Sequence, residues 1–204
     1  FRRSRGLGDV YKRQMPATPI APAERTKNIK YAVRDVLALA DEAKARGLDL
    51  LHLNIGDPNI YGFSPPAAVA EAAIRAIHDN LNGYAPSDGT AAALSTIRED
   101  AEARGTKAIQ HIAITSGCSE AIEIALSALV NAGDRVLVPA PGYPLYTAIL
   151  AKLDAIAVPY HLDESNDWQP DVDEITNLLS TPAKALVLIN PNNPTGSVTP
   201  REVL

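Results

Sequence analysis

Apolar residues in the first half of the chain recur with helical spacing. Across residues 29–46 they fall three or four apart on one face, which predicts an amphipathic helix. Gly47 follows at the position where a glycine commonly ends a helix. Residues 65–80 and 90–104 predict two more helices, and the first of these has proline near its opening turn. Residues 50–55 predict a short extended run before a turn.

From residue 111 onward, short apolar runs alternate with helical segments. Strands that alternate with helices predict an α/β fold, in which a mostly parallel sheet is covered by helices on both faces. The predicted strands are 111–115, 135–138, 155–160 and 184–190, and the helices between them are 119–131, 144–152 and 172–179.

Composition narrows the class of protein. The 204 residues are 46% hydrophobic and 21% charged, which is ordinary for a globular protein with a core. The longest apolar runs, such as residues 183–189, are far too short to span a bilayer, so no membrane segment is predicted. The four histidines show no metal-like spacing, and no metal site is expected: His52, His78, His111 and His161.

Charge is spread unevenly along the chain. Residues 1–14 hold five basic groups and one acid, whereas the rest holds 14 basic and 23 acidic groups. An acidic body is a poor nucleic-acid binder, because phosphate backbones require clustered lysine and arginine. The basic tail lacks the apolar stretch of a secretory signal and precedes Met15, the only methionine. We therefore expect residues 1–14 to be an extraneous, non-native tail. The single cysteine, Cys118, fits a reducing, cytoplasmic setting.

The first candidate site lies where the predicted strand 111–115 runs into a helix through Ser116, Gly117, Cys118 and Ser119. A glycine turn at a helix start presents free N–H groups and the positive helix end, which together suit a phosphate. The alternative is a simple turn in which Ser116 or Ser119 caps the helix. A nucleotide-binding P-loop is disfavoured, since the Gly-Lys-Ser/Thr ending is missing.

Two further candidate loops follow predicted strands. After 184–190 comes a polar loop in which Asn193 offers an amide, and the bonds preceding Pro191 and Pro194 can adopt the cis form. After 135–138, Tyr143 stands between prolines, where an aromatic ring can lie flat on a planar cofactor. Ligands of open α/β sheets bind beyond the carboxyl ends of strands. The alternatives are a strand-ending turn for the first loop and, for the second, packing of Tyr143 and Tyr146 against the core.

These three sites, with the motifs LNIGDP at 53–58 and NGYAPSDG at 82–89, resemble the pyridoxal-phosphate (PLP) enzymes of fold type I, the class I and II aminotransferases. The resemblance covers residues 25–204 and is strongest to the alanine and tyrosine aminotransferase branch. Within it, DESNDWQP at 163–170 and INPNNPTG at 189–196 look like bacterial alanine-synthesising transaminases.

The resemblance implies roles for particular residues. Gly117, Cys118 and Ser119 would bind the PLP phosphate, and Tyr143 would stack on the pyridine ring. Asn193 would bond the cofactor's phenolic oxygen and help to bind the substrate carboxylate. The backbone of Gly56 would contact the same carboxylate. Tyr84 would reach the phosphate of a neighbouring subunit, which implies a homodimer with a shared active site.

The resemblance also implies a domain division and a reaction. Residues 15–55 would be the arm and helix of a small domain, and 56–204 the first part of the PLP-binding large domain. The full protein would move an amino group between an amino acid, alanine by resemblance, and a 2-oxo acid such as 2-oxoglutarate. The family's Schiff-base lysine, pyridine-pairing aspartate and carboxylate-binding arginine find no match before Leu204. We therefore expect this piece alone to be inactive.

Two alternatives remain open at this point. A PLP-dependent C–S or β-lyase on the same fold shares the cofactor-anchoring motifs. A regulator that keeps an aminotransferase-like domain is disfavoured, because about forty residues between Met15 and Gly56 are too few for a DNA-binding domain.

Overall fold

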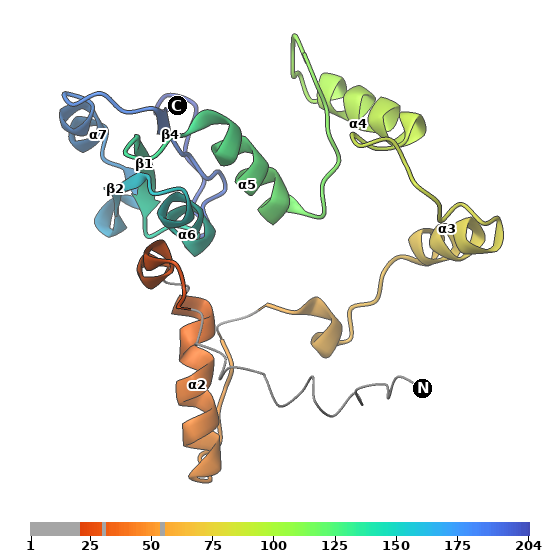
Figure 1. The fold of residues 1–204 in the computed structure, drawn as a ribbon, viewed down its shortest axis with the longest axis horizontal. Helices are drawn as coiled ribbons and strands as arrows, with labels where there is room; N and C mark the ends of the chain where they lie inside the picture. The colour runs from red at the N-terminus through yellow and green to blue at the C-terminus, as the bar shows by residue number, and fades with distance from the viewer. Residues whose placement is uncertain (1–20, 30–31, 54–55) are drawn as a thin grey trace, which may run out of the picture.

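The computed structural model describes residues 21–29, 32–53 and 56–204, without the side chains of 32–35. The expectations for residues 1–14, and for Asn54 and Ile55 of the LNIGDP motif, lie outside the described residues. Helices and short 3-10 turns make up the first half of the chain (Figure 1), in the order η1 (Glu24–Asn28), α2 (Ala32–Ala45), η2 (Pro58–Tyr61), α3 (Ala67–His78) and α4 (Ala91–Ala103).

Local signals set the ends of these helices. Gly47 adopts φ +80° after α2, where the Leu48 amide bonds the Ala43 carbonyl, so the predicted glycine stop is confirmed. The Thr90 hydroxyl caps α4 by accepting from the amide of Ala93 at 3.4 Å. The helix predicted from residue 29 is shorter than expected, because Ile29 is extended and closes η1 instead.

A four-stranded sheet occupies the second half, with helices before and between its strands. The strand order is β3-β2-β1-β4. β1 pairs in parallel with β2 and with β4, and only β3 is antiparallel, which confirms the predicted mostly parallel sheet. The elements are α5 (Cys118–Leu129), β1 (Arg135–Ala140), α6 (Pro144–Lys152), β2 (Ile156–Asp163), η3 (Glu164–Asn166), β3 (Gln169–Pro170), α7 (Val172–Leu178) and β4 (Ala185–Leu186).

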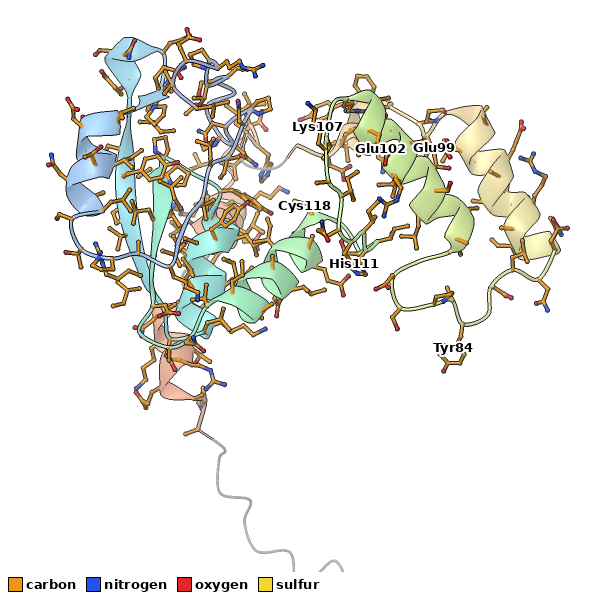
Figure 2. The ribbon with its side chains drawn as sticks, turned by 90° about the horizontal axis from the view of Figure 1, so that it is seen from above. Tyr84, Glu99, Glu102, Lys107, His111 and Cys118 are labelled. Atoms are coloured by element: carbon orange, nitrogen blue, oxygen red, sulfur yellow. The ribbon has the colours of Figure 1, made fainter. Side chains whose placement is uncertain are left out.

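Helices cover both faces of the sheet, as expected. Val136 and Val138 of β1 pack with residues of α5 and α6 in one buried cluster, Leu126, Val130, Ile149 and Leu150. The chain steps from β1 to β2 through α6, then back past β1 to β4 through α7. Because crossovers between parallel strands are right-handed, reversing the direction puts α7 on the opposite face, and Figure 2 shows α7 and α5 on the two sides of the strands.

The strand predicted at 184–190 is cut short by Pro139. Register pairs Leu137 with Leu186, and the amide of Val187 still bonds the Leu137 carbonyl at 2.8 Å. In a continued parallel ladder, residue 139 would donate back to the Val187 carbonyl, but a proline has no N–H. The hydroxyl of Tyr160, which is fully buried on β2, donates to that carbonyl at 2.8 Å instead. β4 is therefore only two residues long.

The strand predicted at 111–115 is absent from the described residues. A strand needs a ladder partner, and here the Ile114 amide bonds only the carbonyl of Asp88, at 2.8 Å. The Ile114 side chain packs against Gly89, so this segment follows the loop before α4 rather than the sheet. No described residue before Leu126 is buried, and Figure 1 shows α2, α3 and α4 apart from the sheet.

β3 was not expected from the sequence, since two residues carry no periodicity. It pairs with Leu162 and Asp163 at the end of β2. Pro159 lies earlier along β2, where the strand pairs with β1 on one side and no described residue pairs with it on the other. A proline, which has no N–H to donate, is tolerated at such an edge position. Within the described ranges, no helix combines the length and apolar character needed to cross a membrane.

Candidate functional site

The carboxyl ends of β1 and β4 lie at the same edge of the sheet, because the two strands are parallel neighbours. The chain order reverses here: β2 follows on one side of β1, and β4 on the other. Such a switch point is where open α/β sheets bind ligands. The two loops predicted as candidate sites, those of Tyr143 and Asn193, both begin at this edge.

The loop after β1 is a tight turn that delivers Tyr143. The bond from Ala140 to Pro141 is cis. At Gly142 an added Cβ would overlap the carbonyl oxygen of Pro139, so only glycine fits there. Tyr143 then occupies the N-cap position of α6, and its side chain is half-buried. The turn therefore fixes where the aromatic side chain leaves the backbone.

The loop after β4 is held closed at its base. The side-chain Nδ2 of Asn190 donates to the backbone carbonyl of Thr199 at 3.3 Å, and the backbone N–H of Thr199 donates to Asn190 Oδ1 at 3.1 Å. The bonds preceding Pro191 and Pro194 are both cis, which confirms that expectation. Asn193 is exposed at the outer part of this loop.

A side chain joins the two loops. Asn192 is 6% exposed, and its Nδ2 donates to the Pro141 carbonyl at 3.4 Å and to the Thr195 hydroxyl at 2.9 Å. The loops that carry Tyr143 and Asn193 are thus in direct contact at the sheet edge. Sequence reasoning missed Asn192, since nothing local indicates a partner 51 residues away.

The start of α5 has no side-chain cap. Gly117 is the N-cap, with φ +84° and ψ 174°, and no side chain caps the helix. The interpretation of Ser116 or Ser119 as the cap is therefore wrong. Nothing lies within 4 Å of where a Cβ of Gly117 would be. The amides of Cys118 and Ser119 fall in the first turn, where an α-helix offers them no partner, so they can donate to an anion.

The start of α5 also lies near α6. Burial raises the pKa of the Tyr146 hydroxyl, and the negative charge of the Cys118 thiolate raises it further. Ile122 and Tyr146 pack against the same core cluster. The core-packing interpretation is therefore correct for Tyr146. The first turns of α5 and α6 therefore share one packed core.

The first turn of α5 also carries an acidic residue, Glu120. The Glu120 carboxylate accepts from the Ser116 amide at 2.5 Å, beside the N–H groups that would hold an anion. A negative charge is stabilised at a helix N-terminus, so the Glu120 carboxylate is favourably placed in this first turn. The acid in the first turn of the predicted helix was a signal that could have indicated it.

Tyr84 and Gly56 are not brought to this edge. Tyr84 is fully exposed and lies well away from Cys118, on the far side of α4 (Figure 2). Gly56 is exposed just before η2, whose first turn is capped by the carboxylate of Asp57. Among the predicted site residues, the structure brings into contact the loops that carry Tyr143 and Asn193.

Comparison with known proteins identifies relatives over most of the chain. The family model for aminotransferase class I and II matches residues 49–204. The glutamate-pyruvate aminotransferase AlaA of Escherichia coli is 40% identical over 190 residues, which is 92% of this chain and 47% of that protein. An alanine aminotransferase of Mycobacterium bovis is 35% identical over 188 residues, 90% of this chain and 44% of that protein.

Solved structures give the same picture. The alanine aminotransferase of Pyrococcus furiosus superimposes with a TM-score of 0.83 at 35% identity, covering 89% of this chain and 47% of that one. The chain thus spans about half the length of the curated relatives that it matches.

Proposed function

This chain belongs to the aminotransferase class I and II family, and from that premise we propose that the complete protein is a PLP-dependent aminotransferase. It exchanges an amino group between an amino acid and a 2-oxo acid, with alanine and 2-oxoglutarate as the pair that its named relatives favour. The observation that carries the proposal is the contact between the strand-end loops of Tyr143 and Asn193. The uncapped start of α5 at Gly117 adds to it.

The residues present fit the cofactor. Its phosphate needs several donors, and the open turn at Gly117 offers the amides of Cys118 and Ser119 and the Ser119 hydroxyl. Its ring needs a flat apolar contact and an in-plane donor, which Tyr143 and the Asn193 amide supply from adjacent loops. When bound, PLP withdraws electrons from the substrate's α-carbon and so stabilises the charge left by the departing proton.

The protein's own task in this proposal is to fix orientation. Gly117 to Ser119 anchor one end of the ligand, Tyr143 sets the plane of the ring, and Asn193 donates to the ring oxygen and helps to bind the substrate carboxylate. Gly56 contributes a backbone contact to that carboxylate.

We propose further that the complete protein is a homodimer. Tyr84 projects into solvent away from the Gly117 turn, which suits contact with a partner's phosphate rather than its own. We keep the division into a small-domain segment, 15–55, and a large-domain part, 56–204. It is supported by the exposed apolar face of α2 and by a core that begins at Leu126. The single cysteine supports a cytoplasmic location.

The test is an assay of the complete natural protein with alanine, 2-oxoglutarate and added PLP. Pyruvate and glutamate formed in equal amounts, without ammonia, would support an aminotransferase. Ammonia released from cysteine or cystathionine would support a lyase instead. A protein that neither binds PLP nor transfers the amino group would contradict the proposal.

A further inference from the structure

Asn192 occupies a buried position in the loop after β4. Its main chain is fully paired within that loop: its N–H donates to the Ser197 carbonyl, and its carbonyl accepts from the Gly196 N–H, both at 2.8 Å. These bonds hold the backbone whichever side chain is present. The side chain is therefore available for a separate task.

That side chain reaches across to the loop after β1. Its Nδ2 donates to the Pro141 carbonyl, two residues before Tyr143, while Asn192 itself directly precedes Asn193. A single amide thus links the segments from which the proposed ring contact and the proposed ring-oxygen donor project. The second bond, to the Thr195 hydroxyl, keeps the amide aimed at Pro141.

The surroundings of the side-chain oxygen indicate that a gain in stability alone does not explain why an asparagine occupies this position. Asn192 Oδ1 is buried and has no hydrogen-bond donor within the described residues. An unpaired buried acceptor is unfavourable, and an apolar side chain of similar size would avoid that loss. Keeping an asparagine here makes sense if the link to Pro141 has a value of its own.

We propose that Asn192 is a positioning residue that fixes the spacing between Tyr143 and Asn193, and so holds the two sides of the ring site in register. The cofactor half of this inference rests on the proposed function. The link itself is a property of the two loops and exists without any ligand.

The chain offers a matched control in Asn190. Asn190 is also an asparagine in the same loop and also makes two side-chain bonds, but both go to Thr199 at the base of its own loop. Replacing Asn190 with alanine therefore removes a comparable pair of bonds without touching the connection to Pro141.

The experiment compares Asn192→Ala and Asn190→Ala in the complete natural protein. Without PLP, hydrogen exchange by mass spectrometry should become several-fold faster in peptides covering residues 139–146 for Asn192→Ala only. With PLP, the dissociation constant should rise roughly three- to ten-fold for Asn192→Ala and less than about two-fold for Asn190→Ala. Asn192→Leu, an apolar side chain of similar size that has no donor, should follow Asn192→Ala and serves if the alanine variant does not fold.

Unchanged exchange in residues 139–146 of Asn192→Ala, or equal effects of the two alanine variants, would overturn the inference. If the wild-type protein binds no PLP, the proposed function fails, and the cofactor half of this inference fails with it. The exchange comparison needs no cofactor and still decides whether Asn192 links the loops.

Discussion

The hydroxyl of Tyr160 lies 2.8 Å from the carbonyl oxygen of Val187 and reaches it across the intervening strand β1. It replaces the donor that Pro139 lacks, so a side chain completes the place where the backbone ladder stops. The bond ties β2 to the segment that leads from β4 into the Asn193 loop. It therefore helps to fix the start of the loop that carries Asn193.

Tyr160→Phe tests this support. The change removes one hydroxyl and leaves the half-buried Val187 carbonyl unpaired, so the free energy of unfolding should fall by about 1 kcal/mol. Denaturant unfolding of the complete protein measures the loss. Tyr61→Phe is the control, because Tyr61 is 64% exposed and should change stability by less than about 0.5 kcal/mol. Equal effects of the two changes would show that the Tyr160 bond contributes nothing.

Because of the Tyr160 hydroxyl, we expect the folded protein to lose stability at alkaline pH. Burial raises the pKa of Tyr160 from 10.0 to about 12. A raised pKa means that the folded state holds the proton more tightly, so this stability is fully present below pH 10 and is lost as pH rises from about 10 to 12. Unfolding curves recorded across that window should fall more steeply for the wild type than for Tyr160→Phe. Some dependence should remain, because the pKa of Tyr146 is also raised.

An acidic counterpart is predicted at Glu174 of α7. Its carboxylate accepts from the His161 amide at 2.6 Å and lies 2.7 Å from His161 Nδ1. The pKa of Glu174 lies below 4.5, chiefly because the backbone N–H of His161 donates a hydrogen bond to the carboxylate. The hydrogen bond with the His161 ring lowers the pKa further, and the charge of Asp171 opposes both effects. A lowered pKa contributes stability above pH 4.5 that disappears as pH falls through the folded-state value.

Glu174→Gln should therefore lower the melting temperature at pH 7 by only about 1–3 °C, since the pair is largely solvent-screened. The difference from the wild type should shrink once the pH drops below 4.5. Asp173→Asn removes one charge from the same turn and is the control. A Glu174→Gln deficit that stays constant into acid would contradict the assignment.

Replacing Gly117 with any other residue should be unfavourable because of the backbone conformation at this position, and not because neighbouring atoms would clash with a side chain. At φ +84° and ψ 174° an alanine is strained, although no atom lies within 4 Å of its Cβ. Gly117→Ala should cost about 1–3 kcal/mol or shift the turn. PLP affinity should then fall more than the affinity for pyridoxal, which has no phosphate. Gly83→Ala, at an open position without positive φ, should change neither. Equal losses for PLP and pyridoxal would argue against a phosphate turn.

Local signals decided which elements could be predicted. The helix predicted at 144–152 is α6, residue for residue, because Pro144 opens it and the apolar run ends at Lys152. The helix predicted at 90–104 matches α4 with its caps, Thr90 and Arg104. Both depend on side chains within a few residues of the helix ends, which a sequence displays directly.

Elements that depend on distant partners could not be predicted in the same way. The length of β4 depends on Pro139, about fifty residues earlier, and residues 111–115 form no ladder because none of the described residues pairs with them. At the site, Gly117, Tyr143 and Asn193 stand out by residue type at strand or helix ends. Asn192 looks like any other loop asparagine until Pro141 is placed beside it.

The two edges of the sheet differ in a way that bears on handling the 204-residue chain. Pro159 withholds a donor on the outer side of β2, and β3 covers the end of that strand. Among the described residues, nothing pairs with the outer side of β4, and its Leu186 and the following Leu188 are each 41% exposed. Self-association of this polypeptide should therefore begin with strand addition along β4, and a charged residue in place of Leu188 should delay precipitation.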